Sequence, residues 1–67
     1  MSPERVGMTL KRLRTARGLT QVTLAKRVGV THGYIAQFER GDHKNPGLAV
    51  LRRLARVLKC TVGELVE

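Results

Sequence analysis

The fold of this chain is decided by residues 20–41, TQVTLAKRVGVTHGYIAQFERG. Apolar residues recur there at helical spacings over residues 21–28 and again over residues 32–40, which predicts two short amphipathic helices. Thr20 and Thr31 each stand immediately ahead of one of these helices, where a threonine hydroxyl can accept a hydrogen bond from the first turn. Two helices separated by so short a joint predict a helix-turn-helix arrangement.

The joint between the two helices is Gly29-Val30. Gly29 suits the left-handed conformation that commonly ends a helix, and we expect Val30 to point inward and hold the corner. The residues of this stretch expected to form the core are Val22, Leu24, Ala25, Val28, Val30, Ile35 and Phe38.

The segment before this stretch also has the pattern of a helix. Ser2 is a good capping residue, Pro3 suits the first helical position, and the helix is expected to end at Gly18. Gly7 lowers helix stability, so we expect it to mark the close approach of another helix, with the last helix of the chain as the expected partner. The expected inward residues are Val6, Leu10, Leu13 and Ala16.

Two more helices are predicted after the stretch. Residues 45–46, Asn-Pro, repeat the pattern of a capped start for a helix that ends near Leu58. Thr61 and Glu64 have the spacing of a capping box, which predicts a last short helix over residues 62–66. The expected inward residues of these two helices are Leu48, Leu51, Leu54, Ala55, Leu58 and Leu65.

Composition favours one small domain that binds a polyanion. Five helices and no strand over residues 1–67 predict a single all-α domain with an aliphatic core. Thirteen Lys and Arg against five Asp and Glu give a net charge of +8, which favours nucleic acid as the partner, with a membrane surface second. No apolar run approaches the roughly 20 residues that span a bilayer and no signal peptide pattern opens the chain, so we expect a cytoplasmic protein.

No catalytic, metal or cofactor site is predicted. Cys60 is the only cysteine, which leaves no disulfide within the chain, and we expect it to be a small core residue. His32 and His43 lie too far from it in sequence to suggest a zinc finger. No paired carboxylates, nucleophile–base set or phosphate-binding glycine motif is present. We therefore expect neither an enzyme nor a small-molecule ligand.

Many positions agree in one register with a known pattern. They are Leu10, Leu13-Arg14, Leu19-Thr20-Gln21, Leu24-Ala25, Gly29-Val30-Thr31, Ile35, Glu39-Arg40-Gly41, Asn45-Pro46, Leu48, Leu51, Leu54-Ala55 and Leu58. In these residues the chain resembles the phage repressor/Cro-type helix-turn-helix family, also called the XRE family. The resemblance extends over roughly residues 6–65 and implies a compact five-helix, repressor-like domain with the helix-turn-helix at its second and third helices.

Arg14 lies beside the inward residues of the first helix, where a charge needs a partner. The resemblance implies that Arg14 forms a structural ion pair with Glu39, near the end of the third helix. We expect this structural role for Arg14 and not a contact with DNA.

The resemblance implies that the third helix, residues 32–40, enters the major groove of DNA with its N-terminal residues at the base edges. Gln37 is the strongest candidate reader, because its amide can bond adenine N6 and N7 together. His32 has three open interpretations: donation to guanine N7 or O6, a phosphate contact, or an exposed residue with no role. Gly33 permits only a backbone approach, and the methyl of Ala36 suits contact with thymine.

A second group of residues is expected to contact the phosphate backbone. Gln21, at the start of the second helix, is placed by the resemblance to bond a phosphate and to brace the third helix. Tyr34 has two open interpretations, since its ring can pack inward while its hydroxyl reaches phosphate. The full set is Thr20, Gln21, Thr31, Tyr34, Arg40, Lys44 and Asn45, supplemented by Lys11 and Arg17. Asp42 is expected to oppose this approach, and Arg52, Arg53 and Arg56 to face water.

The resemblance also implies a homodimer on a two-fold symmetric operator, with half-sites roughly 34 Å apart. The candidate dimer residues are Val50, Val57, Val62 and Val66. The predicted function is a small sequence-specific transcriptional regulator, in its simplest form a repressor. The alternatives are an antitoxin-like interaction module that also binds its operator, and a nonspecific RNA- or DNA-binding protein.

Overall fold

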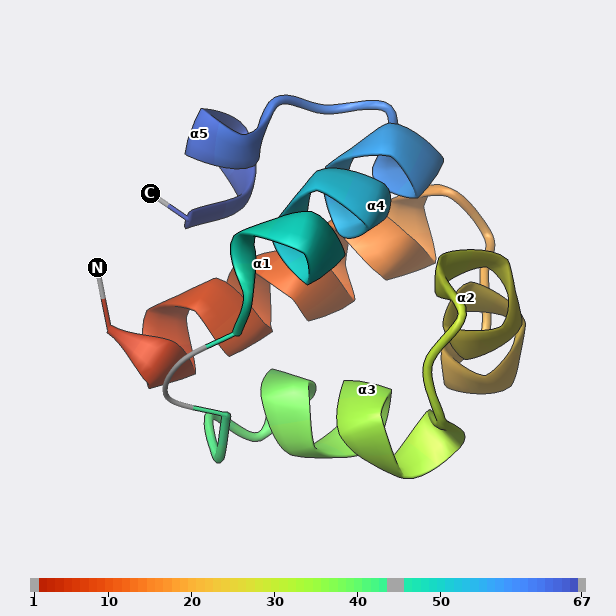
Figure 1. Ribbon diagram of the computed structural model, residues 1–67, viewed down its shortest axis with the longest axis horizontal. Coiled ribbons are helices and arrows are strands. Elements are labelled where there is room, and N and C mark those ends of the chain that lie inside the picture. The colour runs from red at the N-terminus through yellow and green to blue at the C-terminus, as the bar shows by residue number, and fades with distance from the viewer. Residues whose placement is uncertain (1, 44–45, 67) are drawn as a thin grey trace.

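The computed structural model describes residues 2–43 and 46–66, and this part of the chain is entirely helical apart from turns and loops. The helices are α1 Pro3–Ala16, α2 Gln21–Val28, α3 His32–Glu39, α4 Leu48–Leu58 and α5 Val62–Val66. The predicted all-α fold with a helix-turn-helix at α2 and α3 is therefore confirmed (Figure 1).

The helices surround a single interior. α1 packs against α3 and α5, while α2 packs against α3 and α4, and the molecule measures 25 × 22 × 21 Å. In Figure 1, α3 lies along the lower edge, α2 on the right, and α5 on the side opposite α3. This arrangement leaves one side of α3 uncovered by any other helix.

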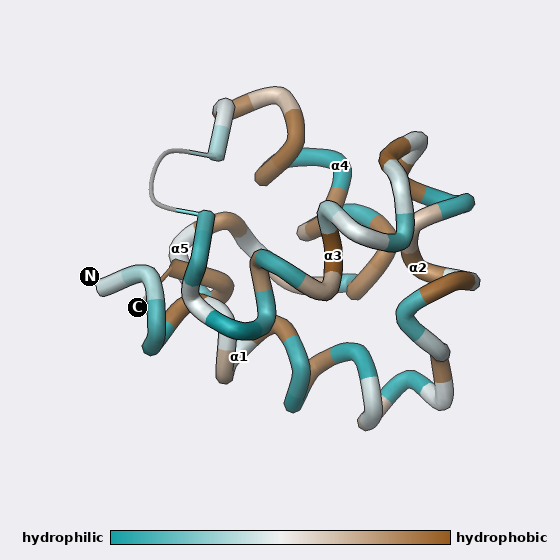
Figure 2. The backbone as a smooth tube through the Cα atoms, turned by 90° about the horizontal axis from the view of Figure 1, so that it is seen from below, coloured by the Kyte–Doolittle hydropathy of each residue, from teal (hydrophilic) through white to brown (hydrophobic). Residues whose placement is uncertain are grey.

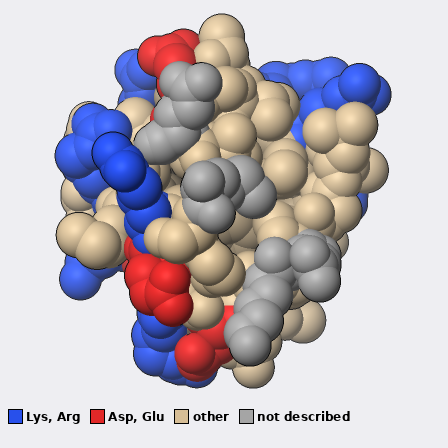
Figure 3. Space-filling model, turned by 90° about the vertical axis from the view of Figure 1, so that its left-hand side faces the viewer, with Lys and Arg blue, Asp and Glu red and all other residues tan. Residues whose placement is uncertain are grey.

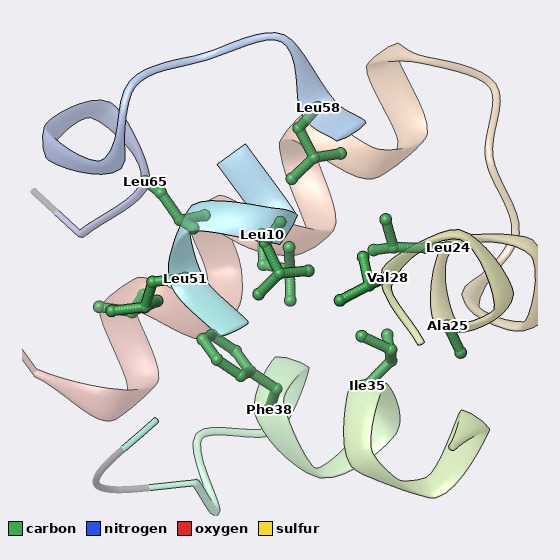
Figure 4. Close-up of a cluster of buried hydrophobic side chains, with 11 residues drawn as sticks. Leu10, Leu24, Ala25, Val28, Ile35, Phe38, Leu51, Leu58 and Leu65 are labelled. Carbon is green, nitrogen blue, oxygen red and sulfur yellow. The ribbon is translucent and has the colours of Figure 1, made fainter. Parts of the chain in front are cut away.

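The core consists of aliphatic side chains and one phenylalanine. Leu10 of α1, Leu24 of α2 and Leu65 of α5 are 0% exposed, although they lie far apart in sequence. Figure 4 shows side chains from all five described helices pointing into this interior. Along α1, hydrophobic and hydrophilic stretches alternate as expected for a helix with one buried side (Figure 2). Cys60 packs partly buried against this core, and burial raises the pKa of its thiol.

The helix starts follow the predicted chemistry. The Ser2 hydroxyl accepts a hydrogen bond from Arg5 N at 3.2 Å, Thr20 accepts one from Thr23 N at 3.0 Å, and Thr31 accepts one from Tyr34 N at 3.1 Å. These oxygens satisfy backbone N–H groups that have no partner within the helix. α1 ends at Ala16, slightly before the predicted end at Gly18.

The predicted start of α4 is wrong. Asn45 lies outside the described residues, Pro46 precedes the helix, and the residue at the N-cap is Gly47, which provides no side-chain hydrogen bond. Leu48 is therefore the first residue of α4, and it is 56% exposed instead of buried.

Two further residues predicted to be inward are exposed. Val22 is 44% exposed, and Ala16 is also on the surface. Both lie two positions from an inward residue, Leu24 and Arg14 respectively, and a separation of two residues turns a side chain toward the other side of a helix.

Gly7 is buried at a close helix contact, as predicted, but the predicted partner is wrong. A Cβ atom at this position would meet the carbonyl oxygen of Phe38 and would lie 2.8 Å from that of Glu39. The neighbouring helix is therefore α3 and not the last helix. The absence of a side chain lets α1 lie directly against the C-terminal turn of α3.

Arg17 has a structural role that its charge did not predict. Its Nε donates to Leu58 O at 3.0 Å and its Nη2 to Lys59 O at 3.4 Å. These carbonyls lie at the C-terminus of α4, where free backbone acceptors and the helix dipole favour a cation. Arg17 therefore joins the end of α1 to the end of α4, and this geometry does not match the supplementary DNA contact expected of it.

The predicted capping box forms at the start of α5. Thr61 N donates to Glu64 Oε1 at 3.0 Å, and Glu64 N donates to Thr61 Oγ1 at 3.0 Å. The backbone hydrogen bond from Thr61, together with its side-chain bond, holds the pKa of Glu64 below its ordinary value of 4.5.

Acidification is expected to weaken this cap. Because the pKa of Glu64 is lower in the folded chain, the unfolded chain binds the proton more readily. The stabilising contribution is complete above the ordinary value of 4.5 and is lost as the pH falls through the lower folded value. Urea unfolding at a series of pH values should show this loss in the wild type and a shallower dependence in Glu64→Gln. Identical pH dependence in both proteins would contradict the prediction.

Candidate nucleic-acid interface

The turn between α2 and α3 directs the start of α3 toward solvent. Gly29 has φ 84°, in the left-handed region, and Val30 N donates to Ala25 O at 3.0 Å. Val30 is half-buried against the core, as predicted. The next residues, Thr31, His32 and Gly33, are all exposed.

The candidate base-reading residues share the uncovered side of α3. His32, Gly33 and Gln37 are exposed, whereas Ala36 is half-buried and offers a smaller contact surface. Figure 2, which views the molecule from the α3 side, shows no other helix in front of α3. α3 ends at Glu39, with Arg40 as its C-cap, one residue before the predicted end.

The predicted ion pair between Arg14 and Glu39 forms in the interior. Arg14 Nε lies 2.6 Å from Glu39 Oε2, and Arg14 Nη2 lies 3.1 Å from Oε1. The two side chains are only 10% and 4% exposed. Arg14 Nη1 also donates to Leu19 O at 2.7 Å, which fixes the segment that leads into α2. The pair therefore ties α1 to the end of α3 and to the entry of the helix-turn-helix.

The ion pair continues into a chain of hydrogen bonds that reaches the start of α3. Gln21 Nε2 donates to Glu39 Oε1 at 3.0 Å, and Gln21 Oε1 lies 3.0 Å from His32 Nε2. Gln21 thus braces both ends of α3 from the first turn of α2. The sequence predicted a brace from Gln21 but not its contact with His32, because these residues meet only when the two helices cross.

The threonines expected at phosphate are also capping residues. The Thr20 hydroxyl accepts from Thr23 N and donates to Thr23 Oγ1 at 2.9 Å. Thr31 accepts from Tyr34 N, and both Thr20 and Thr31 are exposed. Gln21 is half-buried at the N-terminus of α2, where the backbone N–H groups and the helix dipole favour an anion.

Tyr34 packs its ring into a small aromatic group on the side of α3. Its ring centroid lies 4.2 Å from that of His43 and 6.3 Å from that of Phe38. Burial raises the pKa of the Tyr34 hydroxyl, while the nearby charge of Arg53 lowers it. The hydroxyl therefore remains a hydrogen-bond donor at neutral pH. Arg53 is exposed as expected, and its Nη1 lies 3.4 Å from where a Cβ would stand on Gly29.

The positive charge of Arg40, directly after α3, is partly offset by the neighbouring carboxylate of Asp42. Arg40 Nε lies 3.2 Å from Asp42 Oδ2, and both side chains are 62% exposed. An exposed pair of this kind contributes only about 0–1 kcal/mol and can separate when a phosphate approaches. Lys44 and Asn45, also expected at phosphate, lie outside the described residues.

Charge is distributed unevenly over the surface. Figure 3 shows the side of the molecule that lies on the left in Figure 1, where basic and acidic side chains follow one another down the left part of the view while much of the remaining visible surface is uncharged. Residues 2–43 and 46–66 contain no cluster of His, Cys, Asp or Glu that could hold a metal ion. None of the helices described is long and apolar enough to cross a bilayer.

Comparison with known proteins extends these observations. Residues 10–65 match a family model described as helix-turn-helix. This chain belongs to the XRE family of helix-turn-helix proteins. The resemblance inferred from the sequence is thereby confirmed.

One relative of this XRE-family chain is the immunity repressor protein of Bacillus phage phi105, which is 39% identical over 61 residues. The match covers 91% of this chain but only 42% of the repressor. Among solved structures, the restriction-modification controller protein C.AhdI from Aeromonas hydrophila is 38% identical, with a TM-score of 0.88 and 94% of each chain covered. SinR, a master regulator for biofilm formation solved in complex with DNA, is 29% identical with a TM-score of 0.88, over 92% of this chain and 98% of that one.

Proposed function

We propose that this chain binds a specific double-stranded DNA sequence through α3 and thereby regulates transcription, in its simplest form as a repressor. The observation that carries the proposal is the exposed start of α3 at His32 and Gly33, in a helix that is fixed in place by the buried Arg14–Glu39 pair and the side chain of Gln21. A helix end presented in this way fits the major groove. The net charge of +8 supplies the attraction to phosphate.

The names of three of these relatives support a regulator. They are an immunity repressor, a controller protein and a regulator solved with DNA. These comparisons offer no support for the antitoxin-like alternative. A DNA-binding regulator of this kind acts in the cytoplasm, at the nucleoid when bound.

Within this proposal, the residues divide into two groups. His32, Gly33, Ala36 and Gln37 read base edges, with Gln37 as the principal reader of adenine. The residues that contact phosphate are Thr20, Gln21, Thr31, Tyr34, Arg40, Lys44 and Asn45. No metal, cofactor or small-molecule ligand is needed for this activity.

We infer that the active form is a homodimer on a two-fold symmetric operator. Val50, Val57, Val62 and Val66 are half-buried at the edge of the core, and each keeps part of its side chain at the surface. Leu48, at the start of α4, adds an exposed apolar side chain. Sedimentation equilibrium should detect a dimer, and DNA selected from a random pool should contain paired half-sites roughly 34 Å apart. A monomer that selects single, unpaired sites would contradict the dimer.

The central test compares selected with random duplex DNA at several salt concentrations. A specific regulator binds the selected duplex far more tightly at every salt concentration. Equal affinity for both duplexes, with a steep dependence on salt, would instead indicate nonspecific binding by charge alone.

Gln37→Ala is expected to relax the sequence preference at one base position. The loss is about 1–3 kcal/mol for the preferred base, because the bidentate amide contact disappears while the phosphate contacts remain. Competition binding with single-base variants of the selected duplex measures this loss. Arg56→Ala, a surface change on α4, is the control and should leave the preference profile intact. An unchanged profile in Gln37→Ala would show that another residue is the principal reader.

Arg40→Ala is expected to weaken binding about equally for all sequences and to reduce the salt slope by about 1. The reason is that its guanidinium contacts phosphate and carries no sequence information. Titrations of selected and random duplexes over a range of salt concentrations measure both quantities, with Arg56→Ala as a variant of the same charge. If the two variants change the slope equally, Arg40 makes no special phosphate contact.

A further inference from the structure

The hydrogen bond at His32 restricts how this side chain can meet a base. His32 Nε2 lies 3.0 Å from Gln21 Oε1, while Nδ1 has no hydrogen-bond partner within residues 2–43 and 46–66. A neutral imidazole carries one N–H and one acceptor nitrogen. In a neutral histidine either ring nitrogen can carry the proton, so the hydrogen-bond partners of His32 determine which nitrogen donates and which accepts.

The direction of the hydrogen-bond chain is determined by the buried ion pair at its other end. A guanidinium only donates and a carboxylate only accepts, so Arg14 donates to Glu39 and Glu39 cannot donate to Gln21. The amide group that Gln21 turns toward Glu39 must therefore be its NH₂, which donates at 3.0 Å. This orientation follows from the chemistry of the partners.

The orientation of Gln21 determines the tautomer of His32. With its NH₂ on Glu39, Gln21 presents its carbonyl oxygen to His32, and a carbonyl oxygen only accepts. His32 Nε2 must therefore carry a proton. In the neutral ring Nδ1 then has a lone pair, and no N–H remains to donate to guanine N7 or O6.

We propose that His32 is a specificity-determining residue that accepts a hydrogen bond at Nδ1 from an exocyclic amino group in the major groove, either N4 of cytosine or N6 of adenine. These two bases share this donor, whereas guanine offers only acceptors on that edge. The inference rests on the proposed function. It changes the role of His32 from a donor for guanine to an acceptor that discriminates against guanine.

Gln21 keeps its phosphate contact in this arrangement. Its NH₂ has two hydrogens, and only one of them is used by Glu39. The second remains for a phosphate oxygen at the N-terminus of α2. Arg14 and Glu39 touch neither base nor phosphate; they act as positioning residues through Gln21.

The tautomer is tested first, on the protein without DNA. Nitrogen–proton correlation spectra of the imidazole rings at about pH 8, above the ordinary histidine range, should show His32 only in the Nε2–H form. In Gln21→Ala the constraint is removed, and a minor Nδ1–H form should appear. A wild-type His32 that is mainly Nδ1–H would overturn the proposal.

The base preference is tested next, on a duplex selected from a random pool. His32→Ala identifies the position that His32 contacts, and affinities for all four bases there are then measured at about pH 8. Cytosine or adenine should be preferred over guanine by about 2- to 10-fold, the range of one hydrogen bond, and the four affinities decide which of the two is read. Gln21→Ala should narrow this difference, and Arg56→Ala should preserve it.

The outcomes separate this inference from the proposed function. A guanine preference at the His32 position, or no position that depends on His32 while one depends on Gln37, would overturn the role of His32 alone. Equal binding of selected and random DNA by the wild type would overturn the proposed function itself.

Discussion

Glu39→Ala is expected to destabilise the fold by about 3–5 kcal/mol, because it leaves the guanidinium of Arg14 buried without its carboxylate partner. The Arg14 side chain is only 10% exposed, so water cannot replace the lost partner without opening the contact between α1 and α3. Folded domains have total stabilities of only about 5–15 kcal/mol, and a short chain lies toward the lower end. Urea unfolding followed by circular dichroism, at low temperature, measures the difference.

A double variant provides the control for this prediction. Arg14→Met combined with Glu39→Leu removes both charges and keeps apolar volume, and a replacement of this kind is commonly neutral or stabilising. The double variant should therefore be more stable than Glu39→Ala, although it loses the bonds to Leu19 and Gln21. A loss below about 1 kcal/mol in Glu39→Ala would show that the pair is accessible to water and behaves as a surface pair.

The same double variant separates stability from DNA recognition. Once Glu39 is removed, Gln21 is no longer oriented and the tautomer of His32 is no longer restricted. We therefore expect a folded protein that binds DNA with reduced discrimination at the His32 position. Under this proposal the buried pair has two consequences, one for the packing of α1 on α3 and one for base reading.

Gly7→Ala is expected to cost about 1–3 kcal/mol, the usual range for adding atoms to a well-packed contact. The added methyl would overlap the carbonyl oxygens of Phe38 and Glu39, and backbone atoms cannot rotate away as a side chain can. Because alanine in a helix interior contributes about 1 kcal/mol of stability, the net loss is expected to reach about 2 kcal/mol. α1 must therefore move away from the C-terminal turn of α3.

Gly63→Ala is the matched control. A Cβ on Gly63 would lie 3.7 Å from Thr61 Oγ1, an ordinary contact, and the residue lies within α5. Its stability should be unchanged or slightly raised, because alanine restricts the unfolded chain more than glycine does. Equal effects of the two substitutions in thermal unfolding would contradict a close helix contact at Gly7.

Local structure was predictable because its causes lie within a few residues. The caps at Thr20 and Thr31, the turn at Gly29 and the capping box at Thr61 each depend on hydrogen bonds or backbone angles that span at most one helical turn. The spacing of the apolar residues in α2 and α3 then predicts which side of each helix faces the core. The Arg14–Glu39 pair spans 25 residues and was expected only from the resemblance to the XRE family.

The candidate interface was predictable in its position but not in its chemistry. Gln37 and Gly33 lie on the exposed side of α3 as the helical period requires. The bond between Gln21 and His32 joins two helices whose crossing angle no local pattern specifies, so the donor and acceptor roles of His32 were left open. The role of Arg17 was not predictable either. Its charge suggested a supplementary contact with DNA, whereas its guanidinium donates to carbonyl oxygens at the C-terminus of α4.

By itself, the sequence determined five helices, the caps of α1, α2, α3 and α5, a helix-turn-helix and a strongly basic chain, because helical period, capping and charge are properties of neighbouring residues and composition. The tertiary structure decided that Gly7 meets α3, that Val22 and Leu48 stay exposed, and that Arg14, Glu39, Gln21 and His32 form one directed chain of hydrogen bonds. These features depend on how rigid helices far apart in sequence come together. Through this chain of hydrogen bonds, the buried ion pair restricts which nitrogen of the exposed His32 ring carries the proton.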